Sequence, residues 1–271
     1  MPLIQHKREA YWFYRFLSPL YDRWVNPLFW TAEMRSRALP LARLDRRELE
    51  TVDVGAGTGF TTEGIVEHVD ASRVTMVDQS PQQLARAARK PPLARCRRLL
   101  GDAEQLPLAT DSVDRYLSAG SIEYWPQPQQ GIAEAYRVLK AGGVALVIGP
   151  LPPPRGLARW LADAWMLFPK EAAYRRWFQS AGFEQVTSIH LTAPWDGVGR
   201  APYALAIAGV KPKPGSSPLE PAGEHEQLSA PMGFGGRLRF AGRFLAGSAA
   251  GAAFVPAAAA LKLRAKIRRR S

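Results

Sequence analysis

Apolar and polar residues alternate in a regular way between residues 49 and 211. Short apolar runs that read as buried strands occur in TVDVG, RVTMVD, RYLSAGS and VALVIGP. The segments between them include SPQQLARAARK and PQQGIAEAYRVLK, whose apolar residues recur at helical spacing. Two further runs, QVTSIHLT and YALAIAGVK, read as a closing pair of strands. This alternation predicts an α/β fold in which helices wrap a doubly wound parallel sheet over residues 49–211.

The flanking segments do not follow this pattern. Residues 1–48 are rich in aromatic side chains and are interrupted by Pro19 and Pro27, so we expect an N-terminal cap of short helices. Such helices would cover either the edge of the sheet or an apolar substrate. Residues 212–236 combine Pro, Gly and Ser without periodicity, which predicts a linker. Residues 237–271 hold an uncharged run with basic residues on both sides, which predicts a membrane-associated helix.

The charge of the chain is unevenly distributed. The formal net charge of the 271 residues is +12, and residues 237–271 contain nine Lys or Arg and no acidic residue, so residues 1–236 carry only +3. The basic character therefore belongs to the tail, which indicates an anionic lipid surface as a partner and argues against a nucleic acid. The single cysteine, Cys96, excludes an intrachain disulfide framework. We expect no bound metal ion.

A glycine-rich stretch, DVGAGTG, follows the first predicted strand. Glycines at every second position, Gly55, Gly57 and Gly59, let the backbone approach a ligand closely. The third glycine comes one residue too early for a dinucleotide fingerprint, and no Gly-Lys-Ser or Gly-Lys-Thr of a phosphate-binding loop follows. Asp53, on the strand itself, would repel a pyrophosphate and attract a cation. The loop therefore predicts a nucleoside that carries positive charge and no phosphate, as S-adenosylmethionine does.

Further candidate contacts follow at the ends of the next strands. Asp78 ends the second predicted strand, near the spacing at which an acid binds ribose hydroxyls. In GDAEQLPL, Asp102 would accept a hydrogen bond from the adenine amino group, and Ala103 would donate its backbone N–H to the ring. The small residues that begin at Ser118 leave room for the reactive methyl. The predicted contacts of S-adenosylmethionine are Asp53, Gly55, Gly57, Gly59, Asp78, Gln79, Asp102, Ala103 and Ser118.

Several segments also resemble a known family. DVGAGTG, VDQSP, GDAEQLPL and EAYRVLKAGGVALVIGP resemble the motif series of class I S-adenosylmethionine-dependent methyltransferases, which implies a Rossmann-like sheet. A narrower resemblance lies in IQHKREAYWFYRFLSPLYD, SAGSIEYWPQPQQGIAEAYRVLK and WMLFPKEAAYRRWFQSAGF. These are similar to the plastid methyltransferases of 2-methyl-6-phytyl- and 2-methyl-6-solanesyl-1,4-benzoquinol. The resemblance implies ring methylation of a prenylated benzoquinol, on the routes to tocopherols and plastoquinone, at the chloroplast inner envelope membrane. A methyltransferase of a sterol or another small lipid remains the alternative.

Methyl transfer to a ring carbon is helped by a group that accepts the proton of a neighbouring hydroxyl. The candidate catalytic residues are Glu123, directly after the small-residue stretch, and His190, in a predicted strand. A surface carboxylate explains Glu123 equally well, and a structural histidine explains His190. The prenyl chain requires apolar walls, and aromatic residues cluster before the core and in RGLARWLADAWMLFP. The candidate substrate-binding residues are Tyr21, Trp24, Trp30, Trp125, Trp165 and Met166.

The tail leaves three alternatives for its contact with a membrane. Residues 244–261 are uncharged, and a bilayer core requires about 20 apolar residues. Ala and Gly dominate this run and Pro256 interrupts it, so a single span, an interfacial helix and a disordered basic tail all stay open. The N-terminus has neither the apolar run of a secretory signal nor the serine content of a transit peptide. We therefore expect that the transit segment of a chloroplast protein is not part of this sequence.

Overall fold

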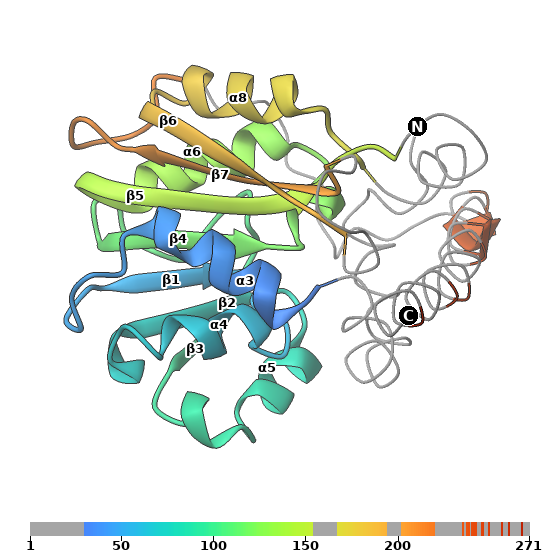
Figure 1. The fold of residues 1–271 in the computed structure, drawn as a ribbon, viewed down its shortest axis with the longest axis horizontal. Helices are drawn as coiled ribbons and strands as arrows, with labels where there is room; N and C mark the ends of the chain where they lie inside the picture. The colour runs from blue at the N-terminus through green and yellow to red at the C-terminus, as the bar shows by residue number, and fades with distance from the viewer. Residues whose placement is uncertain are drawn as a thin grey trace.

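The computed structural model describes residues 30–153, 167–193 and 202–219, with isolated positions between 235 and 267. These residues form a seven-stranded sheet with helices on both faces, as Figure 1 shows, so the predicted α/β fold is confirmed, although the sheet is mixed where a parallel one was expected. Most of the predicted N-terminal cap and of the predicted membrane segment lies outside the described residues. Within the described ranges, no helix has the length and apolar character needed to cross a membrane.

The strands lie in the order β3-β2-β1-β4-β5-β7-β6. Their bounds are β1 (Thr51–Val54), β2 (Val74–Asp78), β3 (Arg97–Leu100), β4 (Val113–Ala119), β5 (Leu139–Pro150), β6 (Glu184–Leu191) and β7 (Ala204–Val210). The pairs among β1 to β5 are parallel, whereas β7 runs antiparallel to both β5 and β6. The chain returns from β3 at the edge to β4 beside β1. Because ligands of doubly wound sheets bind where the strand order reverses, the carboxyl ends of β1 and β4 are the expected position of a site.

Helices cover each face of the sheet and bury a separate apolar cluster against it. One face carries α3 (Ala32–Ala38), η2 (Leu39–Ala42), α4 (Phe60–Ile65) and α5 (Pro81–Ala87), with the short turns η3 (Ala71–Arg73) and η4 (Pro91–Leu93). The other face carries η5 (Ile122–Tyr124), α6 (Pro128–Val138) and α8 (Glu171–Ser180). In Figure 1, α3 lies in front of the sheet and α6 behind it. Burial on both faces explains why the central strands read as continuous apolar runs.

Among the described strands, β3 is the one that the sequence pattern did not predict. Its residues are exposed or half-buried because it forms one edge of the sheet. Two of its four residues are Arg97 and Arg98, so no apolar run marks it. The strand β5 also begins earlier than predicted, at Leu139 in place of Val144. The exposed residues of β3, and the exposed Ala141 and Gly142 in the early part of β5, leave a weak trace in hydropathy.

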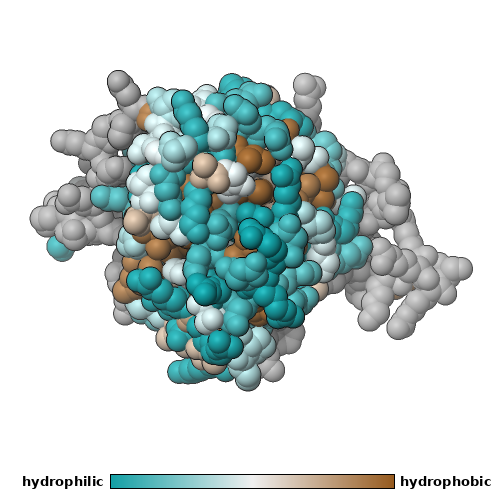
Figure 2. Space-filling view, turned by 90° about the vertical axis from the view of Figure 1, so that its left-hand side faces the viewer, coloured by the Kyte–Doolittle hydropathy of each residue, from teal (hydrophilic) through white to brown (hydrophobic). Residues whose placement is uncertain are grey.

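An ion pair lies at the end of the sheet where the parallel strands begin, which we call the amino edge. Lys211 is fully buried, and its Nζ donates to Asp111 Oδ1 and to the carbonyl oxygen of Gly215, each at 2.6 Å. Ser217 Oγ donates to the carbonyl oxygen of Ala181 at 3.0 Å. The described part of the predicted linker, residues 212–219, is therefore bound to the domain. Figure 2 looks at this edge, the left side of Figure 1, and hydrophilic residues predominate on it.

Candidate active site

The glycine loop connects β1 to α4 at the carboxyl edge of the sheet. Gly55, Gly57 and Gly59 all have positive φ angles, of 69°, 55° and 85°, which side-chain-bearing residues rarely adopt. A Cβ on Gly55 would lie 2.1 Å from Ser121 Oγ, and one on Gly59 would lie 2.3 Å from Leu93 Cδ1. A Cβ on Gly57 would meet no atom of the described residues within 4 Å. The outer two glycines therefore face protein, whereas no described residue packs against the middle one.

Asp78 ends β2 beside this loop. Its Oδ2 accepts the backbone N–H of Gly57, and its Oδ1 accepts that of Ser80, both at 2.8 Å. Burial raises the pKa of Asp78, and hydrogen bonds from the backbone N–H groups of Ser80, Gly57 and Gln79 oppose the rise. The carboxylate thus fixes the loop at Gly57. Its remaining lone pairs can accept the hydroxyl groups of a ligand.

Asp53 lies on β1 below the loop and is 1% exposed. Its Oδ2 accepts the hydroxyl of Thr62, in the helix after the loop, at 2.6 Å. Burial raises the pKa of Asp53 to about 7; the hydrogen bond from Thr62 lowers it, and the charge of Asp78 raises it. Asp53 therefore joins the strand to the helix and lies within the electrostatic reach of Asp78.

The raised pKa of Asp53 predicts that the protein loses stability as pH rises toward neutrality. The folded state holds this proton up to about pH 7, whereas the unfolded chain releases it near 3.8. The stabilising contribution of the proton is complete below the unfolded pKa and disappears as the pH passes the folded pKa. Denaturant unfolding at about pH 5 and about pH 8 should show that the wild type loses roughly 2–3 kcal/mol more than Asp53→Asn. Equal losses in both proteins would contradict the assignment.

Asp102 and Ala103 form a tight turn between β3 and β4. Asp102 Oδ1 accepts the backbone N–H of Glu104 at 3.0 Å, and the N–H of Gln105 donates to the carbonyl oxygen of Asp102 at 3.1 Å. The backbone N–H of Gly101 donates to the carbonyl oxygen of Asp78 at 3.2 Å, so the turn begins beside the end of β2. The residues predicted to contact ribose and adenine therefore come together at one edge of the sheet.

Small residues and one aromatic ring meet at the carboxyl end of β4. Ser118 is 1% exposed, and its Oγ has no hydrogen-bond partner among the described residues. A Cβ on Gly120 would lie 2.8 Å from Nε1 of Trp30, so the indole lies against the end of the strand. Ser121 follows and occupies the space beside Gly55. The space predicted for the reactive methyl thus lies near Trp30 and the glycine loop.

Glu123 lies in η5, directly after this stretch, and is 4% exposed. Burial raises its pKa to about 8. Within the described ranges, its Oε2 has no hydrogen-bond partner. The backbone N–H of Leu167 donates to the carbonyl oxygen of Glu123 at 3.2 Å, so the chain comes back to η5 before α8 begins. The structure excludes the alternative of a surface carboxylate, and a buried carboxyl of this kind is a candidate for contact with a bound molecule.

The structure does not bring His190 to this position. It lies on the edge strand β6, and β5 and β7 separate that strand from β4. Its Nε2 lies 2.7 Å from Oε2 of Glu171, at the start of α8, and its side chain is half exposed. This contact fits the alternative of a structural histidine.

Trp125 is packed inside the fold and is 4% exposed. Its indole N–H donates to Ser121 Oγ at 3.0 Å, and its ring would lie 2.5 Å from a Cβ on Gly131 of α6. Because Ser121 abuts Gly55, the tryptophan supports the glycine loop from behind. The other substrate-binding candidates except Trp30 lie outside the described residues, namely Tyr21, Trp24, Trp165 and Met166.

Sequence reasoning did not single out Thr62 or Ser121. Thr62 stands nine residues after Asp53, in the first turn of α4, and only the folded loop brings its hydroxyl to the carboxylate. Ser121 is marked in the sequence by its place next to Gly120, but its packing against Gly55 joins segments more than sixty residues apart. Both residues therefore depend on tertiary contacts that no local pattern reports.

Comparison with known proteins supports a methyltransferase. A model of the methyltransferase domain matches residues 52–147. The chain is 52% identical over 255 residues to the chloroplastic 2-methyl-6-phytyl-1,4-hydroquinone methyltransferase of Arabidopsis thaliana, covering 93% of this chain and 75% of that protein. It is also 52% identical to the protein of the same name from Spinacia oleracea, covering 93% and 73%. Geranyl diphosphate C-methyltransferase from Streptomyces coelicolor, solved with S-adenosyl-L-homocysteine, gives a TM-score of 0.55 at 16% identity, covering 66% of this chain and 77% of that one, which supports the shared fold alone.

The strand order and the glycine loop, together with the matched domain, define a class I S-adenosylmethionine-dependent methyltransferase, and S-adenosylmethionine is its cofactor. The identity extends over most of both chains. The chain belongs to the family of the 2-methyl-6-phytyl-1,4-hydroquinone methyltransferases, so the resemblance found in the sequence is confirmed.

Proposed function

We propose that this chain methylates the ring of a 2-methyl-6-prenyl-1,4-benzoquinol that carries a phytyl or a solanesyl chain, on the routes to tocopherols and plastoquinone. The relatives in Arabidopsis thaliana and Spinacia oleracea are named for the phytyl hydroquinone, and their 52% identity supports the same class of substrate. One structural observation carries the proposal. Glu123, a buried carboxyl whose Oε2 has no hydrogen-bond partner in the described part of the chain, lies at the same sheet edge as the open face of Gly57.

The described residues fit S-adenosylmethionine. No described atom lies within 4 Å of a Cβ on Gly57, Ser118 has a buried hydroxyl oxygen without a hydrogen-bond partner in the described ranges, and the loop lacks the lysine of a phosphate site. We assign Asp78 and Gln79 to the ribose, and Asp102 and Ala103 to the adenine. Gly55, Gly57 and Gly59 allow the close approach, and Asp53 supports the loop through Thr62. When bound, the cofactor supplies an electrophilic methyl group.

The acceptor ring is assigned to the space beside Trp30 and Glu123. Trp30 lies against Gly120 and presents an aromatic surface at the end of β4. Trp165 and Met166 directly precede Leu167 in the chain, and the backbone of Leu167 contacts Glu123. We propose that these residues, with Tyr21 and Trp24, form the apolar wall for the prenyl chain. Trp125 acts through Ser121 as a support, because its ring is packed within the fold.

We propose Glu123, in preference to His190, as the group that accepts the proton of the quinol hydroxyl next to the target carbon. Removing this proton raises the electron density of the ring carbon that would take the methyl group. That carbon would then release its hydrogen as a proton, and the hydroxyl would be restored. Burial keeps the pKa of Glu123 near 8, so the carboxyl binds the proton tightly once it has taken it. Exclusion of water from the same position would strengthen the interaction between the carboxylate and the hydroxyl.

Substitution of Glu123 by Gln should lower kcat by about 100-fold and leave cofactor affinity unchanged. In the wild type, kcat should rise with pH through about 8, because only the ionised carboxyl accepts a proton. The variant should lack this dependence. Activity assays across the pH range measure kcat and its pH dependence for each protein. His190→Asn is the matched control, with an expected change in kcat of no more than about twofold. A His190→Asn variant that loses the pH dependence, beside a Glu123→Gln variant that keeps it, would reverse the assignment.

The substrate class is tested directly by incubation with labelled S-adenosylmethionine. The proposal predicts transfer of label to the methyl-phytyl and methyl-solanesyl quinols and none to a sterol. Calorimetry with the same preparation checks that the cofactor binds. Label on the sterol alone would favour the other small-lipid methyltransferase, and cofactor binding without transfer to either quinol would refute the substrate assignment.

We also propose that the chain works at the chloroplast inner envelope membrane and contacts lipid through residues 237–271. The uncharged run at 244–261, with basic residues on both sides, supports this proposal, as do the chloroplastic relatives. Flotation with anionic vesicles should recover the full chain and lose a version that ends after Leu219. The cut falls there because residues 212–219 are bound to the domain. Equal flotation of both versions would assign the lipid contact to another segment.

A further inference from the structure

The loop between β3 and β4 carries the turn that we assign to adenine, yet it has little regular structure of its own. Residues 101–112 contain one isolated bridge, between Asp102 and Gln105. Backbone groups beyond this turn must find partners elsewhere, because a buried N–H or C=O without one is costly. The partners determine how firmly Asp102 and Ala103 are held.

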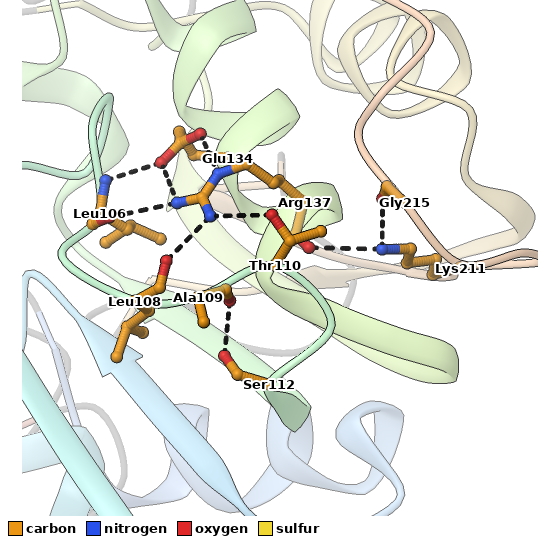
Figure 3. Close-up of polar contacts among 9 residues, drawn as sticks. All are labelled: Leu106, Leu108, Ala109, Thr110, Ser112, Glu134, Arg137, Lys211 and Gly215. Atoms are coloured by element: carbon orange, nitrogen blue, oxygen red, sulfur yellow. Dashed lines mark hydrogen bonds and ion pairs between the residues drawn. The ribbon is translucent and has the colours of Figure 1, made fainter.

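Two side chains of α6 form a close ion pair beside this loop, as Figure 3 shows. Arg137 Nε donates to Glu134 Oε1 at 2.7 Å, and Arg137 Nη2 donates to Glu134 Oε2 at 2.7 Å. Glu134 is 8% exposed, and its carboxylate raises the pKa of Arg137. The pair is therefore a two-bonded, largely buried contact, the arrangement that the planar guanidinium favours.

The same pair binds three backbone groups of the loop. Glu134 Oε2 accepts the N–H of Leu106 at 2.7 Å. Arg137 Nη2 donates to the carbonyl oxygen of Leu106 at 3.1 Å, and its Nη1 donates to that of Leu108 at 2.8 Å. The two residues thus act together as hydrogen-bond partners for the backbone groups of Leu106 and Leu108, which directly follow the turn at Asp102.

The turn itself has a second connection to α6. Glu104 is 1% exposed, and its Oε1 accepts the backbone N–H of Gln127, the residue that precedes the helix, at 2.6 Å. The loop is therefore held at the start of α6 through Glu104 and at its end through Arg137. A rigid helix sets the position of the turn from both sides.

We propose that Glu134 and Arg137 are positioning residues that set the affinity of the site for the adenine base by fixing the turn Asp102–Gln105. This inference rests on the assignment of Asp102 and Ala103 to the adenine. Neither Glu134 nor Arg137 needs to touch the cofactor. The pair acts through Leu106 and Leu108, and a looser loop weakens contacts with the base before it affects the transferred methyl.

Arg137→Lys tests the proposal with the charge retained. A lysine has a single nitrogen and cannot replace the fork that binds Glu134, Leu106 and Leu108 together. Calorimetry should compare S-adenosylhomocysteine with S-inosylhomocysteine, whose hypoxanthine has an oxygen in place of the amino group. We expect the wild type to prefer adenine, and the variant to lose about five- to tenfold of this preference. The KM for S-adenosylmethionine should rise by a similar factor, with kcat at saturation little changed.

Arg175→Lys is the matched control. Arg175 pairs with Glu171 on α8, with Nη2 to Oε1 at 2.8 Å, and it also donates to Ser188 Oγ at 2.7 Å. This ion pair resembles that of Arg137 and Glu134 in chemistry but contacts β6. The Arg175→Lys variant should therefore prefer adenine over hypoxanthine as strongly as the wild type does. Glu134→Gln, which can still accept the N–H of Leu106, should show a smaller loss than Arg137→Lys.

The outcomes separate the inference from the function on which it rests. An unchanged base preference in Arg137→Lys, with a lowered melting temperature, would make the pair purely structural and overturn the inference alone. If the wild type binds S-adenosylhomocysteine and S-inosylhomocysteine equally, the assignment of the Asp102 turn to the adenine is overturned, and the inference with it. Failure of the wild type to bind S-adenosylhomocysteine at all would instead refute the proposed site.

Discussion

Asp78→Ala is expected to weaken the binding of S-adenosylmethionine by at least about 100-fold. The substitution removes the two hydrogen bonds that the ribose hydroxyls are proposed to donate to the carboxylate, of roughly 1.5–3 kcal/mol each. Asp78 accepts the backbone N–H groups of Gly57 and Ser80, so its removal frees the loop as well as the proposed ribose contact. Asp78→Asn should lose less, since an amide oxygen can accept one of the two bonds. Isothermal titration calorimetry with S-adenosylhomocysteine measures both losses.

Asp70→Ala provides the control for this substitution. Asp70 accepts the backbone N–H of Ser72 at 2.9 Å, the same two-residue spacing that relates Asp78 to Ser80, but it stands before β2 begins, at the opposite edge of the sheet. We expect Asp70→Ala to lower the melting temperature slightly and to leave binding unchanged. If Asp78→Ala bound the cofactor as tightly as Asp70→Ala does, the ribose assignment and the role of Asp78 in the loop would both be wrong.

Gly57→Ala should weaken cofactor binding strongly, with only a modest loss of stability. The φ angle of Gly57 is 55°, so an alanine there costs on the order of 1 kcal/mol. Its Cβ would enter a space that no described atom occupies within 4 Å, so the folded chain tolerates the methyl group. A ligand that approaches the loop closely does not. We expect at least about a 100-fold loss of affinity, since a displaced ligand loses several contacts at once.

Gly142→Ala matches this change in everything except position. Gly142 has a φ angle of 78°, and a Cβ there would also meet no described atom within 4 Å, but it lies near the amino end of β5. Both variants should lose similar stability in thermal unfolding, and only Gly57→Ala should lose binding. Equal binding by the two variants would mean that the open face of the loop is not where the cofactor lies.

Much of this fold follows from periodicity, and the exceptions share a cause. The central strands are buried on both faces, so their apolar runs stand out in the sequence. The edge strand β3 begins with Arg97 and Arg98, and its pairing with β2 is a contact that hydropathy does not report. The aromatic residues before the core also have no period, and of those named as candidates the structure places only Trp30 within its described ranges.

Some features of the site can likewise be predicted from the sequence, whereas others depend on tertiary contacts. The spacing of Gly55, Gly57 and Gly59 is visible in the sequence because the loop requires positive φ angles there. The spacing does not reveal which glycine faces a ligand, since that depends on Ser121 and Leu93, which pack against the other two. The sequence favoured Glu123 over His190 but left a non-catalytic role open for both. Burial and strand order distinguish them, because one lies within η5 beside β4 and the other on the far edge strand.

Hydrogen–deuterium exchange with and without S-adenosylhomocysteine tests whether the methyl donor binds across the carboxyl ends of β1, β2 and β3. Binding at these strand ends should slow the exchange of the backbone amides in residues 55–59, 79–80 and 102–106, and leave exchange unchanged in residues 109–112 at the amino edge. Unchanged exchange in all three loops while calorimetry registers binding, or protection confined to the amino edge, would contradict it.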